Sequence, residues 1–472
     1  MPTNLAHLQN AGCHGSVANP CPTEQPAHPS APPFADEVLQ CIHCGLCATF
    51  CPTYREMRTE MQSPRGRIHL ARAVMEGRLR LTREVFNHLD LCLDCRACQT
   101  ACPSGVHYGA LLEKVRAWPE YRRARPLLER LAMAVAMRWI IPSQRGLRAG
   151  GALLRLYRTL GIQFLVRRTG LARLLPRRLR AAEALLPAEA DERLPPLPEV
   201  VPAKGERRAR VALLSGCVMD IMLRSVNWAT VEVLALNGCE VITPRGQRCC
   251  GGLHVHQGET EAARELARHN VDVFERAQVG AVITNAAGCG STMKEYPELL
   301  ADDPVYAKRA AALANRTRDI SEFLISLPLI PPNRVARVAG QPVHSPDTPT
   351  TNHCLRVAYD EPCHLVHGQQ ISAQPRELLR SIPGVELVEL KESDWCCGSA
   401  GVYNIAHPHI ADALLARKLA HIEAADVDVV ASGNIGCLLQ LAKGIRERGL
   451  DIRVAHPIEL LQEAYEASAK DR

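Results

Sequence analysis

Eight cysteines near the N-terminus repeat one spacing twice. In Cys41-Ile-His-Cys44-Gly-Leu-Cys47-Ala-Thr-Phe-Cys51, three cysteines lie three positions apart, a fourth follows, and Pro52 comes directly after it. The same pattern returns from Cys92 and ends at Pro103. This spacing is typical of the bacterial-type ligands of [4Fe-4S] clusters, and in two-cluster proteins the fourth cysteine of each run ligates the other cluster. We therefore expect two [4Fe-4S] clusters, with the ligands Cys41, Cys44, Cys47, Cys51, Cys92, Cys95, Cys98 and Cys102. Structural zinc is the alternative for paired Cys-x-x-Cys units.

Eight further cysteines form two matching sets in the second half of the chain. They are Cys217, Cys249, Cys250 and Cys289, followed by Cys363, Cys396, Cys397 and Cys437. The offsets between the sets are 146, 147, 147 and 148 residues, which indicates an internal repeat. Neighbouring strand residues point to opposite faces, so each cysteine pair can converge only from a turn, and the glycine that follows it permits one.

These two sets are predicted to hold one or two further iron-sulfur clusters. Thiolate is a soft ligand that suits iron, and the two cysteine runs lie in the same chain. Buried free thiols and a redox-active vicinal disulfide are the alternatives. Four histidines near the sets, His254, His256, His364 and His367, either hydrogen-bond a cluster sulfur or are ordinary loop histidines.

The elements around the two runs are predicted to be helical. Ser63 followed by Pro64 is a helix start, and Gly77 is a suitable stop, so we expect a helix over 64–76 and a second one over 82–90. Both cysteine runs are expected to begin at helix ends. These features predict a helical ferredoxin domain over 36–120, after a flexible tail over 1–35 in which Cys13 and Cys21 are bystanders.

The segment over 121–207 is predicted to be a basic helical connector and linker. Between residues 121 and 180 there are fifteen Arg or Lys residues and one acidic residue, Glu129, in a chain whose net charge is +6. One interpretation is a pair of solvated helices, and the other is a docking surface for a partner subunit or for anionic lipid headgroups. Nucleic acid is not expected, because aromatic residues make up only 4% of the chain and no groove-reading motif accompanies the charge.

The second half is predicted to be two α/β domains. Apolar strands over 210–214, 240–242 and 281–284 alternate with a helix over 258–277. The series recurs as strands over 356–359, 385–388 and 429–430 with a helix over 408–423. We expect two Rossmann-like cysteine-rich domains over 208–332 and 355–472, joined by a linker over 333–354, with the cysteines on loops at the carboxyl ends of the strands. The fold class is therefore α+β and multidomain.

The remaining composition favours a location in the cytoplasm and shows no sequence motif of a catalytic site. The chain has 472 residues, twenty cysteines and no apolar signal core, which favours metal ligation in the cytoplasm over disulfides. No run of about 18 apolar residues predicts a membrane span. No nucleotide-binding glycine fingerprint, phosphate loop, Ser-His-Asp arrangement or flavin signature is evident, so no catalytic residue is expected in this chain.

The combined pattern resembles the iron-sulfur subunits of glycolate oxidase (glycolate dehydrogenase). It is similar more broadly to the cysteine-rich family that includes the heterodisulfide reductase B subunit, the lactate-utilisation iron-sulfur protein and the anaerobic glycerol-3-phosphate dehydrogenase C subunit. The resemblance covers about residues 36–462. Its most specific segments are Ser63-Pro-Arg-Gly-Arg-Ile68, Leu91-Cys-Leu-Asp-Cys-Arg-Ala-Cys98, Cys102-Pro-Ser-Gly-Val106, Ala287-Gly-Cys-Gly290, Cys396-Cys-Gly-Ser-Ala-Gly401 and Asn434-Ile-Gly-Cys437.

This resemblance implies an electron-transfer subunit of an oxidoreductase complex. FAD-containing partner subunits would oxidise glycolate to glyoxylate, and this chain would pass the electrons to a membrane acceptor such as a quinone. A contact of the 121–180 segment with the inner face of the cell membrane would suit that role. Lactate or glycerol-3-phosphate is the alternative donor.

One departure from the wider family concerns the cysteine sets. In heterodisulfide reductase a fifth thiol per repeat belongs to a Cys-x-x-Cys pair, and here those positions are Ala286 and Asn434. Four thiols can still hold an ordinary [4Fe-4S] cluster. The departure weighs against a thiol-disulfide reductase, which is the alternative from another functional class, and leaves open a third interpretation in which the repeats are a metal-free platform.

Overall fold

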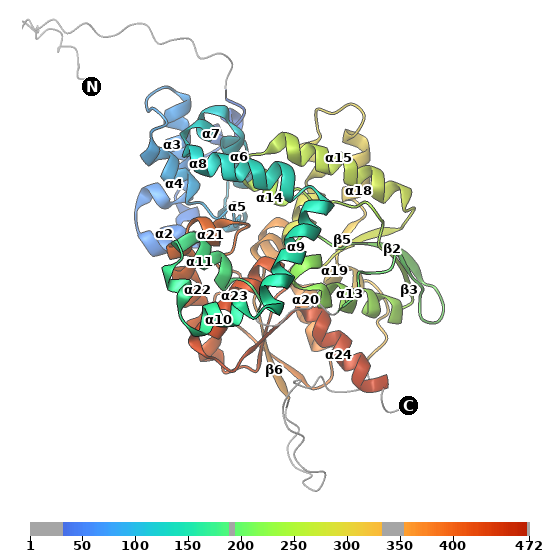
Figure 1. Ribbon diagram of the computed structural model, residues 1–472. Helices are drawn as coiled ribbons and strands as arrows, with labels where there is room; N and C mark the ends of the chain where they lie inside the picture. The colour runs from blue at the N-terminus through green and yellow to red at the C-terminus, as the bar shows by residue number, and fades with distance from the viewer. Residues whose placement is uncertain (1–31, 188–193, 333–353, 470–472) are drawn as a thin grey trace, which may run out of the picture.

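Short helices surround the two cysteine runs in the computed structural model, which describes residues 32–187, 194–332 and 354–469 (Figure 1). Cys13 and Cys21 lie outside the described residues. The N-terminal part contains α1 (Ala35–Leu39), η1 (Leu46–Phe50), α2 (Pro52–Met57), η2 (Glu60–Gln62), α3 (Pro64–Met75), α4 (Arg83–Asp90), α5 (Ala97–Thr100), α6 (Tyr108–Ala117) and α7 (Pro119–Ala124).

The two helices predicted between the cysteine runs are confirmed. Helix α3 begins after Ser63, whose Oγ accepts a hydrogen bond from the Gly66 backbone N–H at 2.9 Å. The helix ends at Met75, and Gly77 follows with a φ of +70°, which glycine adopts without strain. Helix α4 is capped by Thr82 in the same way. Because α1 and α4 end just before the two runs, both runs begin at helix ends, as predicted.

A chain of amphipathic helices follows and crosses the front of the molecule in Figure 1. It consists of α8 (Leu127–Val135), η3 (Ala136–Ile140), α9 (Gln144–Thr159), α10 (Ile162–Arg168), η4 (Leu171–Leu174) and α11 (Arg177–Ala184). Helix α9 packs on the first repeat through α12 (Met219–Met222), whereas α11 packs on α21 (Tyr403–Ala406) of the second. These helices from α8 to α11, called the linker helices below, therefore contact both repeats.

Each repeat is built on a parallel sheet. The first contains β2 (Ala209–Leu214), β3 (Cys239–Ile242), β4 (Ala281–Thr284) and β5 (Thr317–Asp319), in the order β3-β2-β4-β5, with the short β1 (Val200–Val201) antiparallel at its edge. The second contains β6 (Leu355–Tyr359), β7 (Val385–Val388), β8 (Val429–Ala431) and β9 (Arg453–Ala455), in the order β7-β6-β8-β9. The predicted parallel α/β layers are confirmed. The finer Rossmann-like description is not confirmed, because both parallel orders read 2-1-3-4 in place of 3-2-1-4.

Helices cover both faces of each sheet. In the first repeat they are α13 (Arg224–Leu236), α14 (Gly252–His256), α15 (Thr260–Arg276), α16 (Ala287–Lys294), α17 (Tyr296–Leu299), α18 (Ala307–Ala314) and α19 (Ile320–Ile325). In the second they are η6 (His364–Gly368), α20 (Ala373–Arg380), α22 (Pro408–Ala425), α23 (Ile435–Arg448) and α24 (Pro457–Ala469), together with α21.

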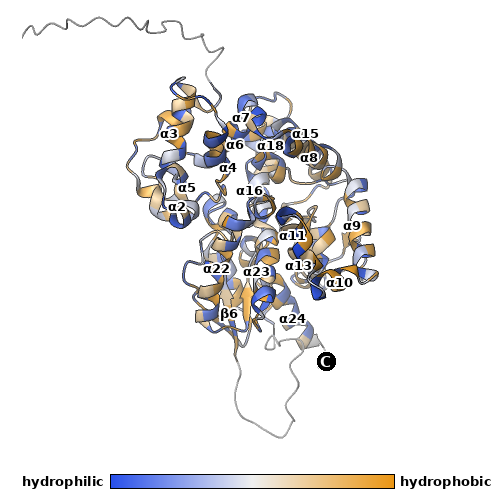
Figure 2. Ribbon diagram, turned by 60° about the vertical axis from the view of Figure 1, so that its left-hand side comes forward, coloured by the Kyte–Doolittle hydropathy of each residue, from blue (hydrophilic) through white to orange (hydrophobic). Residues whose placement is uncertain are grey.

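Alternating strand residues divide the repeats into three apolar cores. Val211 and Leu213 face a core that is shared with Val357 and Tyr359 of the second repeat, where α13 packs against α24 and α19 against α20. Ala212 faces the opposite way, into a core that the first repeat forms with Ile141 packed against it. The apolar strand β6 stands out in Figure 2. Because one core spans both sheets, the two repeats form a single packed body.

The two repeats differ at two matched buried positions near their cysteines. In the second repeat Lys418 Nζ lies 2.8 Å from Asp360 Oδ1, and both side chains are almost fully buried. At the cysteine offsets of 147 and 146 residues, the first repeat carries the buried apolar side chains Val271 and Leu214. A buried ion pair therefore stands beside one set of cysteines, and an apolar pair stands beside the other.

Candidate metal centres

The cysteines of the two runs gather into two groups. Cys41, Cys44 and Cys47 line one pocket together with Cys102 from the second run. Cys51, from the first run, lines another pocket with Cys92 and Cys95, and Cys98 lines both pockets. The fourth cysteine of each run thus lies beside the other run, the placement that ligand exchange between the runs requires. The groups differ in access, because Cys44 is exposed whereas the second group is buried.

A buried arginine lies against the second group. Arg67, on α3, is only 1% exposed, and its Nη1 lies 3.9 Å from Cys51 Sγ. Its other nitrogens donate to the His88 carbonyl, Thr53 Oγ1 and Gln62 Oε1 at 2.8, 3.0 and 2.7 Å. Burial opposes the charge, but the neighbouring cysteines raise the pKa of Arg67, so its side chain stays positive. The protein thus places a fixed cation beside these sulfurs.

Each repeat brings its four cysteines together at the carboxyl end of its sheet. In the first, Cys217 Sγ lies 3.5 Å from Cys249 Sγ, and the Cys250 thiol contacts those of Cys249 and Cys289. Gly251 has a φ of +93°, which permits the turn that lets both members of the pair converge. In the second, contacts run in the same order from Cys363 through Cys396 and Cys397 to Cys437. All eight cysteines of the two sets are therefore convergent.

The positions of the fifth cysteines of the wider family carry other side chains here, Ala286 and Asn434. Asn434 takes the place of one missing cysteine, and its Nδ2 lies 3.5 Å from Cys437 Sγ as a hydrogen-bond donor. Its Oδ1 accepts a hydrogen bond from the Gly288 backbone N–H of the first repeat at 3.3 Å. Ala286 is buried and offers only a methyl group. The amide of Asn434 therefore links the second set to α16, the helix that carries Cys289. The expectation that all eight cysteines lie on loops is wrong for Cys289 and Cys437, because α16 and α23 begin two residues before them.

The chemistry of these donors fits iron-sulfur clusters. Burial raises the pKa of the Cys95 and Cys98 thiols well above the usual value, so thiolates there need a compensating positive charge. In the first repeat, hydrogen bonds from Cys249 and Cys289 lower the pKa of Cys250 while the pKa values of its two neighbours rise. The Cys250 thiol therefore ionises more readily than its two neighbours. Bound iron would let all thiols of a group ionise.

The four groups follow one another through the protein. Cys95 and Cys396 lie in one buried apolar cluster, which joins the second run to the second repeat. The Tyr403 hydroxyl donates to the Leu91 carbonyl at 3.1 Å and seals this junction. The second repeat then reaches the first through the bond from the Gly288 N–H to Asn434 and another from the Ala287 N–H to the Gly433 carbonyl at 3.1 Å. These contacts connect the groups in the order first group, second group, second repeat, first repeat, and the first repeat also contacts the second run directly through Arg116.

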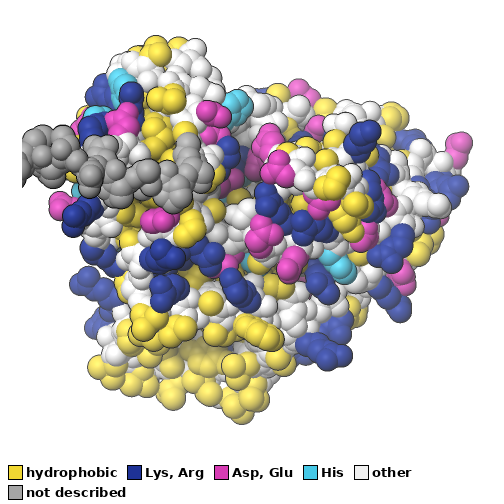
Figure 3. Space-filling view, turned by 90° about the horizontal axis from the view of Figure 1, so that it is seen from above, with side chains coloured by type: hydrophobic (Ala, Val, Ile, Leu, Met, Phe, Trp, Pro, Cys, Tyr) yellow, Lys and Arg dark blue, Asp and Glu magenta, His cyan; other side chains and the backbone are white. Residues whose placement is uncertain are grey.

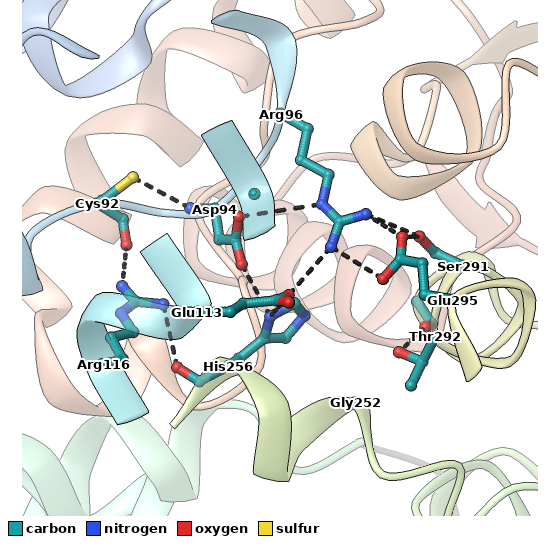
Figure 4. Close-up of polar contacts among 12 residues, drawn as sticks. Cys92, Asp94, Arg96, Glu113, Arg116, Gly252, His256, Ser291, Thr292 and Glu295 are labelled. Atoms are coloured by element: carbon teal, nitrogen blue, oxygen red, sulfur yellow. Dashed lines mark hydrogen bonds and ion pairs between the residues drawn. The ribbon is translucent and has the colours of Figure 1, made fainter. Parts of the chain in front are cut away.

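A buried network of charges holds the junction of the cysteine runs and the first repeat (Figure 4). Arg96 lies between carboxylates from three segments, with Nη2 3.0 Å from Glu113 Oε1 and Nη1 paired to Glu295. His256 Nδ1 lies 2.9 Å from Asp94 Oδ2. Burial raises the pKa of Asp94, but the bond from His256 and the nearby cations bring it well below its usual range. Burial and the Asp94 charge raise the pKa of Glu113 to about 8.

The four histidines singled out from the sequence have other partners. His254 Nε2 lies 2.7 Å from the Met137 carbonyl, and His256 pairs with Asp94. His367 Nδ1 lies 3.1 Å from Thr100 Oγ1, and His364 contacts the backbone of Asp94. Within the described part of the chain, none of these contacts joins a histidine to a cysteine sulfur. They hold segments together, a role that the sequence could not indicate.

Known families match the cysteine runs, the helices between them and the repeats, and the two cysteine-rich repeats. A family described as "Cysteine-rich domain" matches residues 211–294 and again 357–442. A "4Fe-4S dicluster domain" matches residues 37–106. The linker helices fall within a match to "Glycolate oxidase iron-sulfur subunit, linker region" over residues 128–186.

Two similar proteins match nearly the whole of this chain, and a third matches about half of it. The "Probable glycolate oxidase iron-sulfur subunit" of Bacillus subtilis (strain 168) is 40% identical over 91% of this chain and 94% of its own. The "Glycolate oxidase iron-sulfur subunit" of Escherichia coli (strain K12) is 33% identical over 92% of this chain and 95% of its own. A more distant relative, "Lactate utilization protein A" of Shouchella clausii (strain KSM-K16), is 32% identical over 53% of this chain and 98% of its own. The chain belongs to the family of glycolate oxidase iron-sulfur subunits.

Proposed function

We propose that this chain is the electron-transfer subunit of a glycolate oxidase complex. Partner subunits that contain FAD oxidise glycolate to glyoxylate, and this chain carries the electrons away. The observation that supports this role is the row of four cysteine groups, which connect the exposed Cys44 with the interior of the first repeat. The relatives are named as glycolate oxidase iron-sulfur subunits. Catalysis of substrate oxidation belongs to the partners.

The division of labour within the chain follows from its parts. We assign residues 36–120 to two [4Fe-4S] clusters, one held by Cys41, Cys44, Cys47 and Cys102 and the other by Cys51, Cys92, Cys95 and Cys98. The repeats over 208–332 and 355–472 hold one cluster each through their four cysteines. Bound clusters supply one-electron transfer. The protein's own contribution is to bury the sulfurs, to place Arg67 and Asn434 beside them, and to hold neighbouring groups in contact.

The flavoprotein partner docks over the first cysteine group. Large apolar side chains are exposed around Cys44, among them Leu39, Ile42, Leu46 and Phe50. Exposed apolar side chains gathered at one place mark interaction surfaces in soluble proteins. A partner that covers these side chains also covers the one exposed cysteine among the sixteen proposed ligands. This placement makes the first group the point where electrons enter.

The linker helices form a second exposed apolar face, which we assign to the membrane surface. Most of the large exposed apolar side chains of the described chain lie between residues 127 and 179. Figure 3 shows hydrophobic side chains along one edge of the molecule beside a row of Lys and Arg side chains. An apolar face with arginines around it suits an anionic lipid surface, where each basic residue adds about 1 kcal/mol. Representative members are Leu128, Trp139, Leu153, Leu160, Phe164 and Leu174.

This face does not cross the bilayer. Within residues 32–187, 194–332 and 354–469, no helix is both long enough and apolar enough to do so. Flotation with vesicles tests the surface contact: we expect binding to phosphatidylglycerol vesicles, weaker binding to phosphatidylcholine, and loss of both in Leu153→Glu/Leu160→Glu. The control Val305→Glu changes an exposed apolar residue of the first repeat. If the chain binds no vesicle but a partner protein buries this face, the membrane assignment is wrong.

Iron counting and substrate-driven reduction test the electron-transfer role. With four irons per cluster, the assignment predicts about sixteen irons per chain, and a metal-free platform predicts about eight. Glycolate should reduce the clusters in the complex with its flavoprotein partners, whereas D-lactate should not. Cys44→Ser should lower the iron content and stop this reduction while the flavoprotein still reduces an artificial dye. Cys354→Ser, an exposed cysteine outside the four groups, is the matched control.

A further inference from the structure

A cavity of about 790 Å³ lies between linker helix α9 and the first repeat. Small-molecule sites in proteins have volumes of this order, roughly 300–1,000 Å³. Leu147, Gly151 and Leu154 contribute to one wall from α9, and Ile221 contributes from α12 of the repeat. The linker and the repeat therefore enclose a space large enough for a ring-sized ligand with part of a side chain.

Two of the four cysteines of the first repeat form part of the floor of this cavity. Cys217 and Cys249 both line it, and both belong to loops at the carboxyl ends of parallel strands. Open α/β sheets bind their ligands at this edge. Gln247 fixes the floor, since its Oε1 accepts from the Ser215 N–H at 2.9 Å and its Nε2 donates to the Leu213 carbonyl at 3.2 Å. A molecule in the cavity would lie directly against the last group in the row.

The charged side chains that line the cavity favour an electron-rich ligand. Arg148, Arg155 and Arg248 line it, are exposed, and have no side-chain partner among the described residues. The acidic residue in the lining, Asp220, is paired with Arg224, whose Nε lies 3.3 Å from its Oδ1. The remaining lining includes apolar side chains and prolines. Carbonyl or anionic oxygens would find donors here, whereas a cation would be repelled.

The position of α9 determines how such a ligand arrives. Its Leu147 and Leu154 line the cavity, while Leu153, Leu156 and Leu160 of the same helix are exposed on the apolar linker face. One helix therefore separates the cavity from the face that we assign to the membrane. A ligand dissolved in the bilayer would need to pass only the edge of this helix to reach Cys217.

We propose that this cavity binds the terminal electron acceptor, and that the acceptor is a membrane quinone. The inference rests on the proposed function, which supplies the electrons. A quinone is apolar, carries two carbonyl oxygens for the arginines, and becomes a quinol on taking up two electrons and two protons. The electrons are the two released when glycolate becomes glyoxylate, passed one at a time, and the protons come from water at the cavity mouth. Each C=O bond becomes a C–OH bond, and the ring becomes aromatic.

Two neighbouring glycines of α9 provide a matched test. A Cβ on Gly151 would lie 3.5 Å from Ile221 Cγ2, so Gly151→Leu points into the cavity without a backbone clash. A Cβ on Gly150 would meet nothing within 4 Å, so Gly150→Leu leaves the cavity open. Both glycines are inside the same helix, where replacing Gly favours helix formation by up to about 1 kcal/mol. Both variants should therefore fold.

The experiment uses the iron-loaded complex with its flavoprotein partners and a short-chain azido-quinone as the probe. We expect the photolabel in peptides from 142–155 or 215–224, and at least tenfold weaker binding of the probe to Gly151→Leu. Gly150→Leu should bind within twofold of the native complex. Labelling elsewhere, or equal affinity in both variants, would overturn the cavity assignment. A cross-link that places a segment of a partner subunit in the cavity would overturn the assignment as well.

A second readout separates this inference from the proposed function. Glycolate should bleach the visible absorbance of the clusters in the absence of quinone, in the native complex and in both variants alike. If bleaching fails while the probe still labels the cavity, the donor assignment is wrong and the acceptor site stands. If bleaching occurs while the label maps elsewhere, the acceptor site is wrong and the electron-transfer role stands.

Discussion

Replacing Arg67 should lower the reduction potential of the buried cluster of the cysteine runs. Its Nη1 lies 3.9 Å from Cys51 Sγ, and its side chain is shielded from water. A unit charge at about 4 Å contributes roughly 4 kcal/mol at an effective dielectric constant of about 20. For a one-electron couple this energy corresponds to about 170 mV, because about 59 mV changes the equilibrium constant by a factor of ten. Because the cluster spreads its charge over several atoms, we expect a fall of about 100–170 mV in Arg67→Met.

The same substitution should also destabilise the domain. It leaves the His88 carbonyl, Thr53 Oγ1 and Gln62 Oε1 without the donor they share. Removing one partner from a buried charged network costs about 3–5 kcal/mol. Arg67→Lys keeps the positive charge but loses the planar guanidinium group. This variant should keep most of the native reduction potential and lose part of the free energy of unfolding. This variant separates electrostatics from packing.

Redox titration of the loaded chain, followed by electron paramagnetic resonance, measures the potential. Arg72→Gln is the control, because Arg72 lies on the same helix but is partly exposed and pairs with Glu76 at 2.7 Å. It should shift no cluster potential by more than about 20 mV, since surface pairs contribute little. If Arg67→Met keeps the native reduction potential with its iron intact, the electrostatic reasoning is refuted.

Three further predictions concern the second repeat. Lys418→Val should lower the free energy of unfolding in denaturant by about 3–5 kcal/mol, because Asp360 stays buried without its cation and keeps only the hydrogen bond from Ser432 Oγ. Lys418→Val/Asp360→Leu should recover most of that loss, and a double variant that does not recover it would contradict this. Burial lowers the pKa of His456 to about 4 in the folded protein. As the pH falls, the histidine therefore takes up its proton in the unfolded chain before it does so in the folded one. The free energy of unfolding should drop by about 2 kcal/mol between about pH 7 and pH 5. His456→Asn should flatten that pH dependence, and an unchanged slope would exclude His456 as its source. Asn434→Ala removes the hydrogen-bond donor to Cys437 Sγ, and one hydrogen bond contributes about 1 kcal/mol. The reduction potential of the second-repeat cluster should therefore fall by about 40 mV, which redox titration beside the native chain measures.

The elements were predictable from the sequence because local signals define them. The Ser63 cap, the Gly77 stop and the apolar runs that became β2 and β6 each act within a few residues. The regular offsets between the cysteine sets revealed the duplication, and each set gathers at one sheet edge. The strand order was not predictable, because the same alternation of strands and helices suits more than one doubly wound arrangement.

The contacts between distant segments were beyond the reach of sequence patterns. Arg96 meets Glu295 across 199 residues, and no spacing rule links them. His256 looked like a group that could tune a cluster, yet it pairs with Asp94 between two domains. The cavity beside Cys217 is formed jointly by the linker and the first repeat, so neither segment alone indicates it. Sequence patterns predicted the ligand cysteines, and tertiary packing decided which of these cysteines are neighbours.

The closure of the second repeat over the second cysteine run has a consequence for how the protein is made. The Tyr403 hydroxyl bonds to the Leu91 carbonyl across 312 residues, and His407 Nε2 lies 3.0 Å from Asp90 Oδ2. Because the N-terminal part leaves the ribosome first, the buried group around Cys95 exists for a time without this cover. Iron delivery to that group is therefore easiest before synthesis ends. A chain cut short after the linker would carry this cluster open to oxygen.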